Sequence, residues 1–136
     1  MSRYIDMHFM TGMTVMIMTV GCRMNDVRLV DGPSASEGRV ELCSLNGVWG
    51  TICHNYWDAR DAMVICRQLG YQPTTAIGFP GYSPRGTGPI HRDYVACVGT
   101  ESTLAECPPC AECSINTALC THSHDVGVSC FPHGTK

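Results

Sequence analysis

The residues best suited to chemistry lie close together near the C-terminal end of the chain. Four cysteines are followed there by two histidines within a short run: Cys107, Cys110, Cys113, Cys120, His122 and His124. Cysteines at C-x-x-C spacing with histidines to follow are typical of a structural zinc site. The same spacing occurs in thiol–disulfide exchange enzymes, but their reactive cysteine begins a helix, whereas Cys107 is predicted to end one.

Other catalytic patterns do not stand out in the sequence. We find no Ser, His and Asp order, glycine-rich phosphate loop or pair of acidic residues, so we expect a protein that is not an enzyme. The net charge is −3 and Lys and Arg form no long run, which argues against nucleic acid as a partner because phosphates need clustered positive charge. Arg60, Arg85 and Arg92 are candidates for contacting an anionic ligand, with solvated surface charge as the alternative.

The ten cysteines of the 136-residue chain indicate a covalent framework. Nine of them lie between Cys43 and Cys130, which fits disulfides across a whole domain better than one reactive site. Such a framework persists only in an oxidising compartment, so we expect a secreted or extracellular protein, or the ectodomain of a larger one. With 44% hydrophobic and 15% charged residues, the composition is that of one globular domain.

Several short strands are predicted around one helix. Residues 38–43 alternate apolar and polar side chains, and residues 48–53 follow after Asn46-Gly47, a strong hairpin signal, so two antiparallel strands are expected here. A shorter strand is expected at residues 27–30, before turn residues, and a final one at residues 126–130, which are rich in β-branched side chains.

One main helix is predicted between Asp58 and Gly70, where apolar residues recur at helical spacing. Asp58 is placed to cap its start, Asp61 lies near its positive end, and Gly70 follows its last turn. Trp49 and Trp57, on either side of this segment, are predicted to be core residues and not ligand contacts.

The segments after the helix are harder to interpret. Residues 72–88 are rich in Pro, Gly, Thr and Ser without a period, which predicts a long surface loop with Phe79 or Tyr82 as an aromatic anchor. Residues 89–98 are expected to supply a strand ending at Cys97. Thr100 is predicted to cap a short helical turn that ends at Cys107.

The first 24 residues differ from the rest and hold seven of the eight methionines. The apolar run at residues 9–20 is too short to span a bilayer, so this chain shows no transmembrane segment. We expect residues 1–24 to be a secretory signal, with cleavage before Cys22, or else the product of a misassigned start or a cut from a longer protein. The domain is predicted to cover residues 27–131, followed by a short tail at 132–136.

Motifs in the right order along most of the chain resemble those of a scavenger receptor cysteine-rich (SRCR) domain. They comprise Val27-Arg28-Leu29-Val30, Gly38-Arg39-Val40-Glu41, Trp49-Gly50-Thr51-Ile52-Cys53, Trp57-Asp58, Asp61-Ala62, Val64, Cys66-Arg67-Gln68-Leu69-Gly70-Tyr71, Gly86-Thr87-Gly88-Pro89-Ile90, Asp93, Val95, Cys97, Gly99-Thr100-Glu101-Ser102, Leu104, Glu106-Cys107-Pro108 and Asp125-Val126-Gly127-Val128-Ser129-Cys130. The resemblance covers about residues 27–130. It implies an α+β fold: a small disulfide-rich domain in which a curved antiparallel sheet cradles one main helix.

The resemblance also implies three disulfide bridges, namely Cys53–Cys120, Cys66–Cys130 and Cys97–Cys107. Tyr71 stands where one subgroup of the family has another cysteine, which places this chain nearer the six-cysteine group A type. These pairs would use Cys107 and Cys120, the cysteines that a zinc site in the C-terminal run needs.

Four cysteines lie outside that scheme: Cys22, Cys43, Cys110 and Cys113. We expect a fourth bridge from Cys43 to Cys110 or Cys113, because Cys43 precedes the strand that bears Cys53, whose implied partner lies in the same loop as that pair. If Cys22 is removed with a signal, one thiol is left over, either free or linked to another chain.

Many members of the family bind a calcium-like cation through acidic residues. The corresponding positions here hold His54, Asn55 and His124, with Asp93 as the remaining acid, so the resemblance implies a degenerate calcium site. His54 and His124 occupy positions that the family fold brings close together, with His122 nearby. Because imidazoles suit zinc or copper and titrate near neutral pH, these residues are candidates for a soft-metal or pH-sensitive site.

The sequence therefore predicts a non-catalytic extracellular module of scavenger-receptor type. Its expected partners are proteins, polyanions or microbial surface ligands, in innate recognition or cell adhesion. Two alternatives remain open: a homotypic adhesion or structural module, and a zinc-binding Cys/His domain.

Overall fold

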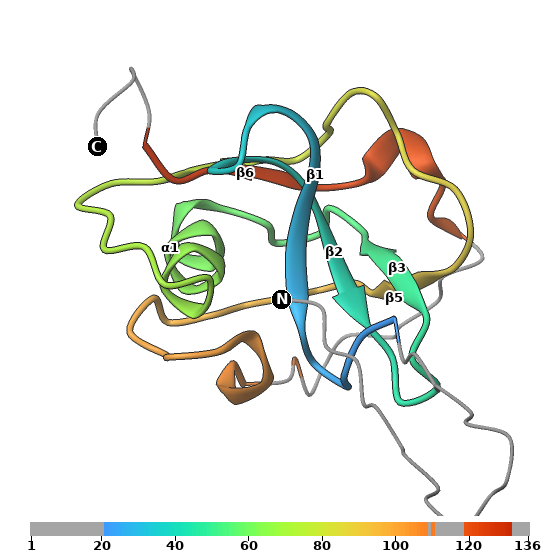
Figure 1. Cartoon of the computed structure of the whole chain (residues 1–136), viewed down its shortest axis with the longest axis horizontal. Helices are drawn as coiled ribbons and strands as arrows, with labels where there is room; N and C mark the ends of the chain where they lie inside the picture. The colour runs from blue at the N-terminus through green and yellow to red at the C-terminus, as the bar shows by residue number, and fades with distance from the viewer. Residues whose placement is uncertain (1–20, 109, 111–118, 132–136) are drawn as a thin grey trace, which may run out of the picture.

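The computed structural model describes residues 21–108, 110 and 119–131, which form a small α+β domain (Figure 1). Its strands and helices follow in chain order: β1 (Val27–Ser34), β2 (Glu37–Cys43), β3 (Trp49–Ile52), α1 (Ala59–Gln68), β4 (Ile77–Phe79), β5 (Ile90–Arg92), the 3₁₀ turn η1 (Leu104–Glu106), the 3₁₀ turn η3 (His122–His124) and β6 (Gly127–Ser129). Residues 1–20, on which the expected secretory signal falls, and the predicted tail at 132–136 lie outside the described residues.

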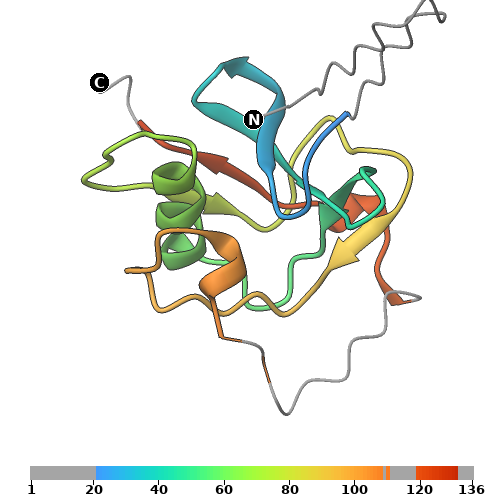
Figure 2. The same ribbon diagram turned by 60° about the horizontal axis from the view of Figure 1, so that its bottom comes forward.

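The sheet is organised around β2, which is buried from Gly38 to Cys43. Its strands lie in the order β4-β6-β2-β3-β5, and β1, which is outside this order, also pairs with β2. These pairings are antiparallel with one exception, since β5 runs parallel to β3. Figure 2 shows how the strands curl around the core, so the predicted curved sheet is confirmed.

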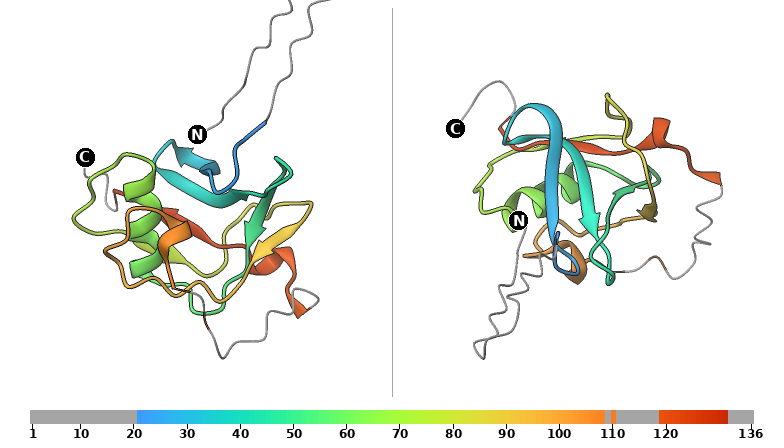
Figure 3. Two further views of the ribbon diagram at one scale, coloured as in Figure 1. Left: turned by 90° about the horizontal axis from the view of Figure 1, so that it is seen from below. Right: turned by 45° about the vertical axis from the view of Figure 1, so that its right-hand side comes forward.

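The predicted helix is confirmed at both ends. Asp58 caps α1 and forms a reciprocal capping box with Asp61, whose carboxylate accepts a hydrogen bond of 2.8 Å from the Asp58 backbone N–H. Gly70 follows the helix with a φ of +93°, a conformation that favours glycine. The buried face of α1 packs against β4, β6 and η1, as Figure 3 shows from two sides.

Three predictions for the loops need correction. The expected loop at residues 72–88 contains β4, which was missed because three residues are too few to show a period. The strand expected at residues 89–98 is shorter and forms only β5. Thr100 does not cap the next turn, since η1 begins after Thr103, which makes no side-chain cap hydrogen bond.

The three disulfides implied by the resemblance are present: Cys53–Cys120, Cys66–Cys130 and Cys97–Cys107. Because Cys107 and Cys120 are held in bridges, the interpretations of the C-terminal run as a zinc site or an exchange enzyme are wrong. Cys66–Cys130 fastens α1 to the residue that follows β6. Cross-links of long loops typically contribute about 2–4 kcal/mol each to the stability of a domain.

The expected bridge from Cys43 to Cys110 or Cys113 is wrong, because Cys43 pairs with Cys22. Backbone hydrogen bonds from Asn25 N–H to Cys43 and from Cys43 N–H to Asp26 extend the pairing of β1 with β2 and bring residue 22 beside the end of β2. Cys22, which lies before the predicted start of the domain at residue 27, is thus bridged to the sheet. Cys110 is also disulfide-bonded, and Cys113 lies outside the described residues.

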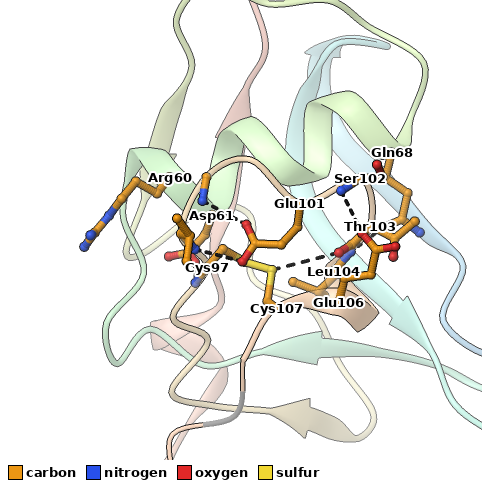
Figure 4. The surroundings of a disulfide bond; sticks show 12 residues. Arg60, Asp61, Gln68, Cys97, Glu101, Ser102, Thr103, Leu104, Glu106 and Cys107 are labelled. Atoms are coloured by element: carbon orange, nitrogen blue, oxygen red, sulfur yellow. Dashed lines mark hydrogen bonds between the residues drawn. A yellow bond between two sulfur atoms is a disulfide. The ribbon is translucent and has the colours of Figure 1, made fainter.

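Asp61 connects the start of α1 to the segment before η1. Its side chain is fully buried and accepts a second hydrogen bond of 2.8 Å from the Cys97 N–H, next to the Cys97–Cys107 bridge (Figure 4). Burial raises the pKa of the Asp61 carboxyl to about 6.

No helix in the described part of the chain has the length and apolar character needed to cross a bilayer.

The raised pKa of Asp61 predicts a pH-dependent stability. Because the folded protein binds this proton more tightly than the unfolded chain, the free energy of unfolding should fall as the pH rises from about 4 to about 7. Relative to Asp61→Asn, which cannot titrate, the wild type should lose up to about 3 kcal/mol over this range. Urea unfolding of both proteins across the range measures this difference. A constant difference would contradict the prediction.

Candidate functional site

The loop at residues 81–88, called the Arg85 loop below, is fixed on both sides of Arg85 by buried charged residues. The Arg39 guanidinium donates to the Pro84 carbonyl, and the Gly86 N–H donates to the Asp125 carboxylate over 2.7 Å. Arg39 is 5% exposed and Asp125 is fully buried. Because both anchors are buried in the domain, they hold the backbone on either side of Arg85 in place.

Each anchor is held by further charged or polar groups. Arg39 forms ion pairs with Asp31 at 2.9 Å and Glu41 at 3.3 Å. His122 Nδ1 lies 2.9 Å from the Asp125 carboxylate, and His122 Nε2 lies 2.9 Å from the Gly88 carbonyl. His122, predicted as a metal-site candidate, therefore has a structural role in holding the far end of the loop.

The structure separates the three candidate arginines. Arg85 is exposed and lines a pocket of about 550 Å³ with Tyr82, Ser83 and Ser123, and it has no carboxylate partner among the described residues. Arg60 is exposed too, but both its Nε and Nη2 donate to the Asp58 carboxylate, at 3.2 and 2.7 Å. Arg92 is half-buried in β5. Of these three candidates, Arg85 is therefore the one whose guanidinium is both exposed and without a carboxylate partner among the described residues.

Tyr82, which belongs to the Arg85 loop, also fastens the loop to the rest of the domain. Its backbone N–H donates to the Asp125 carbonyl and its hydroxyl donates to Glu37 over 3.0 Å. Burial and the Glu37 carboxylate raise the pKa of the Tyr82 hydroxyl to about 12. The prediction of an aromatic anchor in this loop fits Tyr82.

Asp93 and Asn55, two of the predicted metal candidates, are joined by hydrogen bonds. The buried Asp93 carboxylate accepts from the Asn55 backbone N–H at 3.1 Å, from Asn55 Nδ2 at 2.9 Å and from the Tyr94 N–H at 2.8 Å. Three N–H donors thus surround the one carboxylate that the resemblance leaves for a cation. A hard ion would have to displace them, which disfavours calcium here.

His54 and His124 lie against each other, as the resemblance implied. Their rings stack with centroids 4.4 Å apart and planes 19° from parallel. His122 does not join them, since both of its ring nitrogens face the acceptors described above. The three histidines grouped by the sequence analysis therefore divide into a facing pair and a structural residue.

The two tryptophans differ from one another. Trp57 is 7% exposed and its Nε1–H donates to the Gly127 carbonyl, so its prediction as a core residue is confirmed. Trp49 is only half-buried and lies under the Arg28 guanidinium, 4.2 Å from the ring centroid. The prediction of Trp49 as a core residue is therefore wrong, since Trp49 is the first residue of β3 and stays partly exposed.

Arg39 and Asp125 were not recognised as positioning residues. Arg39 occupies a polar position of an alternating strand, a pattern typical of a solvent-facing side chain, whereas the structure buries it. For Asp125 the sequence did offer a signal of importance, because this residue begins the last motif of the resemblance, directly before the final strand.

Comparisons with known proteins agree with this architecture. Residues 30–131 match the family model described as the scavenger receptor cysteine-rich domain. The chain is 47% identical over 113 residues, 82% of its length, to the galectin-3-binding proteins of Bos taurus and Mus musculus. It spans only 20% and 19% of those relatives.

Two solved structures are similar as well. The third SRCR domain of murine neurotrypsin matches with a TM-score of 0.69 and 47% identity, over 77% of this chain and 94% of that one. The SRCR domain of mouse MARCO, in its dimeric form, matches with a TM-score of 0.58 and 39% identity, over 76% of this chain and 93% of that one.

The contacts of Asp93 predict the behaviour of Asn55→Asp. This change replaces the Nδ2 donor with a second carboxylate, so without metal the variant should lose about 1–3 kcal/mol of unfolding free energy. Millimolar calcium should restore part of the loss by bridging the two carboxylates, and should leave the wild type unchanged. Thermal unfolding with and without calcium measures both effects.

Asn55→Ala is the matched control, since it removes the same donor without adding a charge and should not respond to calcium. Stabilisation of the wild type by calcium to the same extent as Asn55→Asp would contradict the assignment.

Proposed function

The chain belongs to the scavenger receptor cysteine-rich family of extracellular ligand-binding modules, and we propose that it binds polyanionic ligands through the Arg85 loop without catalysis. The observation that carries this proposal is an exposed guanidinium with no carboxylate partner in the described structure, placed on a loop that buried residues hold on both sides.

The chemistry of Arg85 favours sulfate, phosphate and carboxylate groups. A guanidinium presents N–H donors in a fork that matches two oxygens of such an anion, and these charge-assisted hydrogen bonds are stronger than neutral ones. Ser83 and Ser123 line the same pocket and offer additional polar groups beside the anion, whereas the Tyr82 hydroxyl is already bonded to Glu37.

The anchoring of the loop also supports binding. Ordering a mobile loop costs free energy when a ligand binds, and that cost is smaller for a segment already fixed in place. Here Pro84, Gly86 and Gly88 are each hydrogen-bonded to a residue outside the loop. Since the chain carries a net charge of −3, attraction of an anion depends on this local site and not on the field of the whole molecule.

We also propose that the chain is nearer the six-cysteine group A type. Tyr71 stands where the other subgroup has a cysteine, and its ring packs edge-on against Phe131 with centroids 5.2 Å apart. An aromatic contact thus fills this position next to the Cys66–Cys130 bridge, and Cys22–Cys43 is an additional cross-link at the opposite end of the sheet.

Binding to a sulfated polysaccharide such as dextran sulfate tests the proposed function. Arg85→Ala should weaken binding about 10- to 100-fold, because a hydrogen bond to a charged group contributes about 1.5–3 kcal/mol. Arg60→Ala should change the affinity by less than about twofold, since Asp58 already neutralises Arg60. Biolayer interferometry at low and high salt measures these affinities, and binding should weaken with salt.

Arg85→Lys is the matched variant, because it keeps the charge without the planar fork and should bind with intermediate affinity. Equal losses in Arg60→Ala and Arg85→Ala, or wild-type binding that is insensitive to salt, would contradict the role of the Arg85 loop.

A further inference from the structure

The stacked pair of His54 and His124 is fixed by the backbone on both sides. Cys53 and Asp125 form an isolated antiparallel bridge, and His54 follows the first of these residues while His124 precedes the second. In antiparallel pairing the next residues outward also face each other, which places the two imidazoles side by side. The Cys53–Cys120 disulfide joins the same two segments.

The ring nitrogens of this pair are available. Neither His54 nor His124 has a side-chain hydrogen bond in the described part of the structure. By contrast, both nitrogens of His122 face acceptors and His91 Nε2 lies 2.9 Å from the Val48 carbonyl. Of these four histidines, only the stacked pair therefore has all its nitrogens free to bind a ligand.

The potential ligand atoms are close to one another. One nitrogen of each imidazole and the Cys53 sulfur all lie within 4.8 Å of each other. The sulfur is held in the disulfide with Cys120, so it supplies no thiolate and the donors are two imidazoles. A turn of one ring about its Cβ–Cγ bond would let both nitrogens approach the same ion.

We propose that His54 and His124 form a two-imidazole site for a divalent transition-metal ion, Zn²⁺ or Cu²⁺, with water completing the coordination. Imidazole nitrogen suits both ions, whereas calcium prefers oxygen ligands, and Cu²⁺ should bind more tightly than Zn²⁺. His54 and His124 are both partly exposed, so an ion can reach the pair from solvent. The site is separate from Arg85 and does not depend on the proposed function.

The test is titration of the full chain with zinc chloride and with copper chloride, followed by calorimetry. His8 and His133, which lie outside the described residues, are first changed to Gln so that they do not add heat. We expect one ion bound per chain, and a loss of affinity of about tenfold or more in either His54→Gln or His124→Gln. Thermal unfolding without metal should be nearly the same for all variants.

His91→Gln is the matched control and should bind like the wild type. In proton NMR, Cu²⁺ below one equivalent should broaden the ring signals of His54 and His124 first and leave that of His91 sharp. The absence of saturable heat, or equal broadening of all four histidines, would overturn the proposal and leave the stack as simple packing. Arg85→Ala should leave metal binding unchanged, which keeps failure here distinct from failure of polyanion binding.

Discussion

The buried Asp125 is the residue on which both candidate sites depend. Its carboxylate accepts from the Gly86 N–H and lies 2.9 Å from His122 Nδ1, its carbonyl accepts from the Tyr82 N–H, and its backbone pairs with Cys53. A carboxylate without such partners could not be buried, since removing an unpaired charge from water costs far more than one hydrogen bond contributes. Close approach is also needed, because a Cβ on Gly86 would lie 3.2 Å from the Asp125 carboxylate and 2.9 Å from Arg39 Nε. The chain therefore needs glycine at residue 86 for the Arg85 loop to reach its anchors.

The helix α1 completes the hydrophobic core that the small sheet covers on one side. A ten-residue helix is not stable alone in water, so α1 needs tertiary fixation. Its start is held by Asp61, which bonds the helix cap and the segment at Cys97, and its far half is held by the Cys66–Cys130 bridge. None of these contacts involves the stacked histidines or Arg85.

Local signals in the sequence predicted the elements that local chemistry determines. The hairpin at Asn46-Gly47, the cap at Asp58 and the stop at Gly70 each depend on a few neighbouring residues, and all agree with the structure. The resemblance supplied the three long-range disulfides, which no local pattern could give. The partner of Cys43 was missed because it depends on how residues 22–26 continue beside β2, before the first recognisable strand. The roles of Arg39 and His122 could not be predicted either, since both depend on loop segments that approach them only in the folded chain.

The pairing of Asn55 with Asp93 explains how the domain can keep its fold without the acidic cation ligands that the resemblance implies at this place. A lone buried carboxylate needs either a cation or several hydrogen-bond donors. The amide and backbone N–H of Asn55, with the Tyr94 N–H, supply three donors, so Asp93 is satisfied without an ion. Because no cation is required to satisfy Asp93, the neighbouring positions 54 and 124 do not have to supply carboxylate ligands, and here they hold histidines. Because the Cys53–Cys120 bridge still holds their backbones together, two imidazoles can face each other there, and the local preference shifts from oxygen-seeking ions toward those that bind nitrogen.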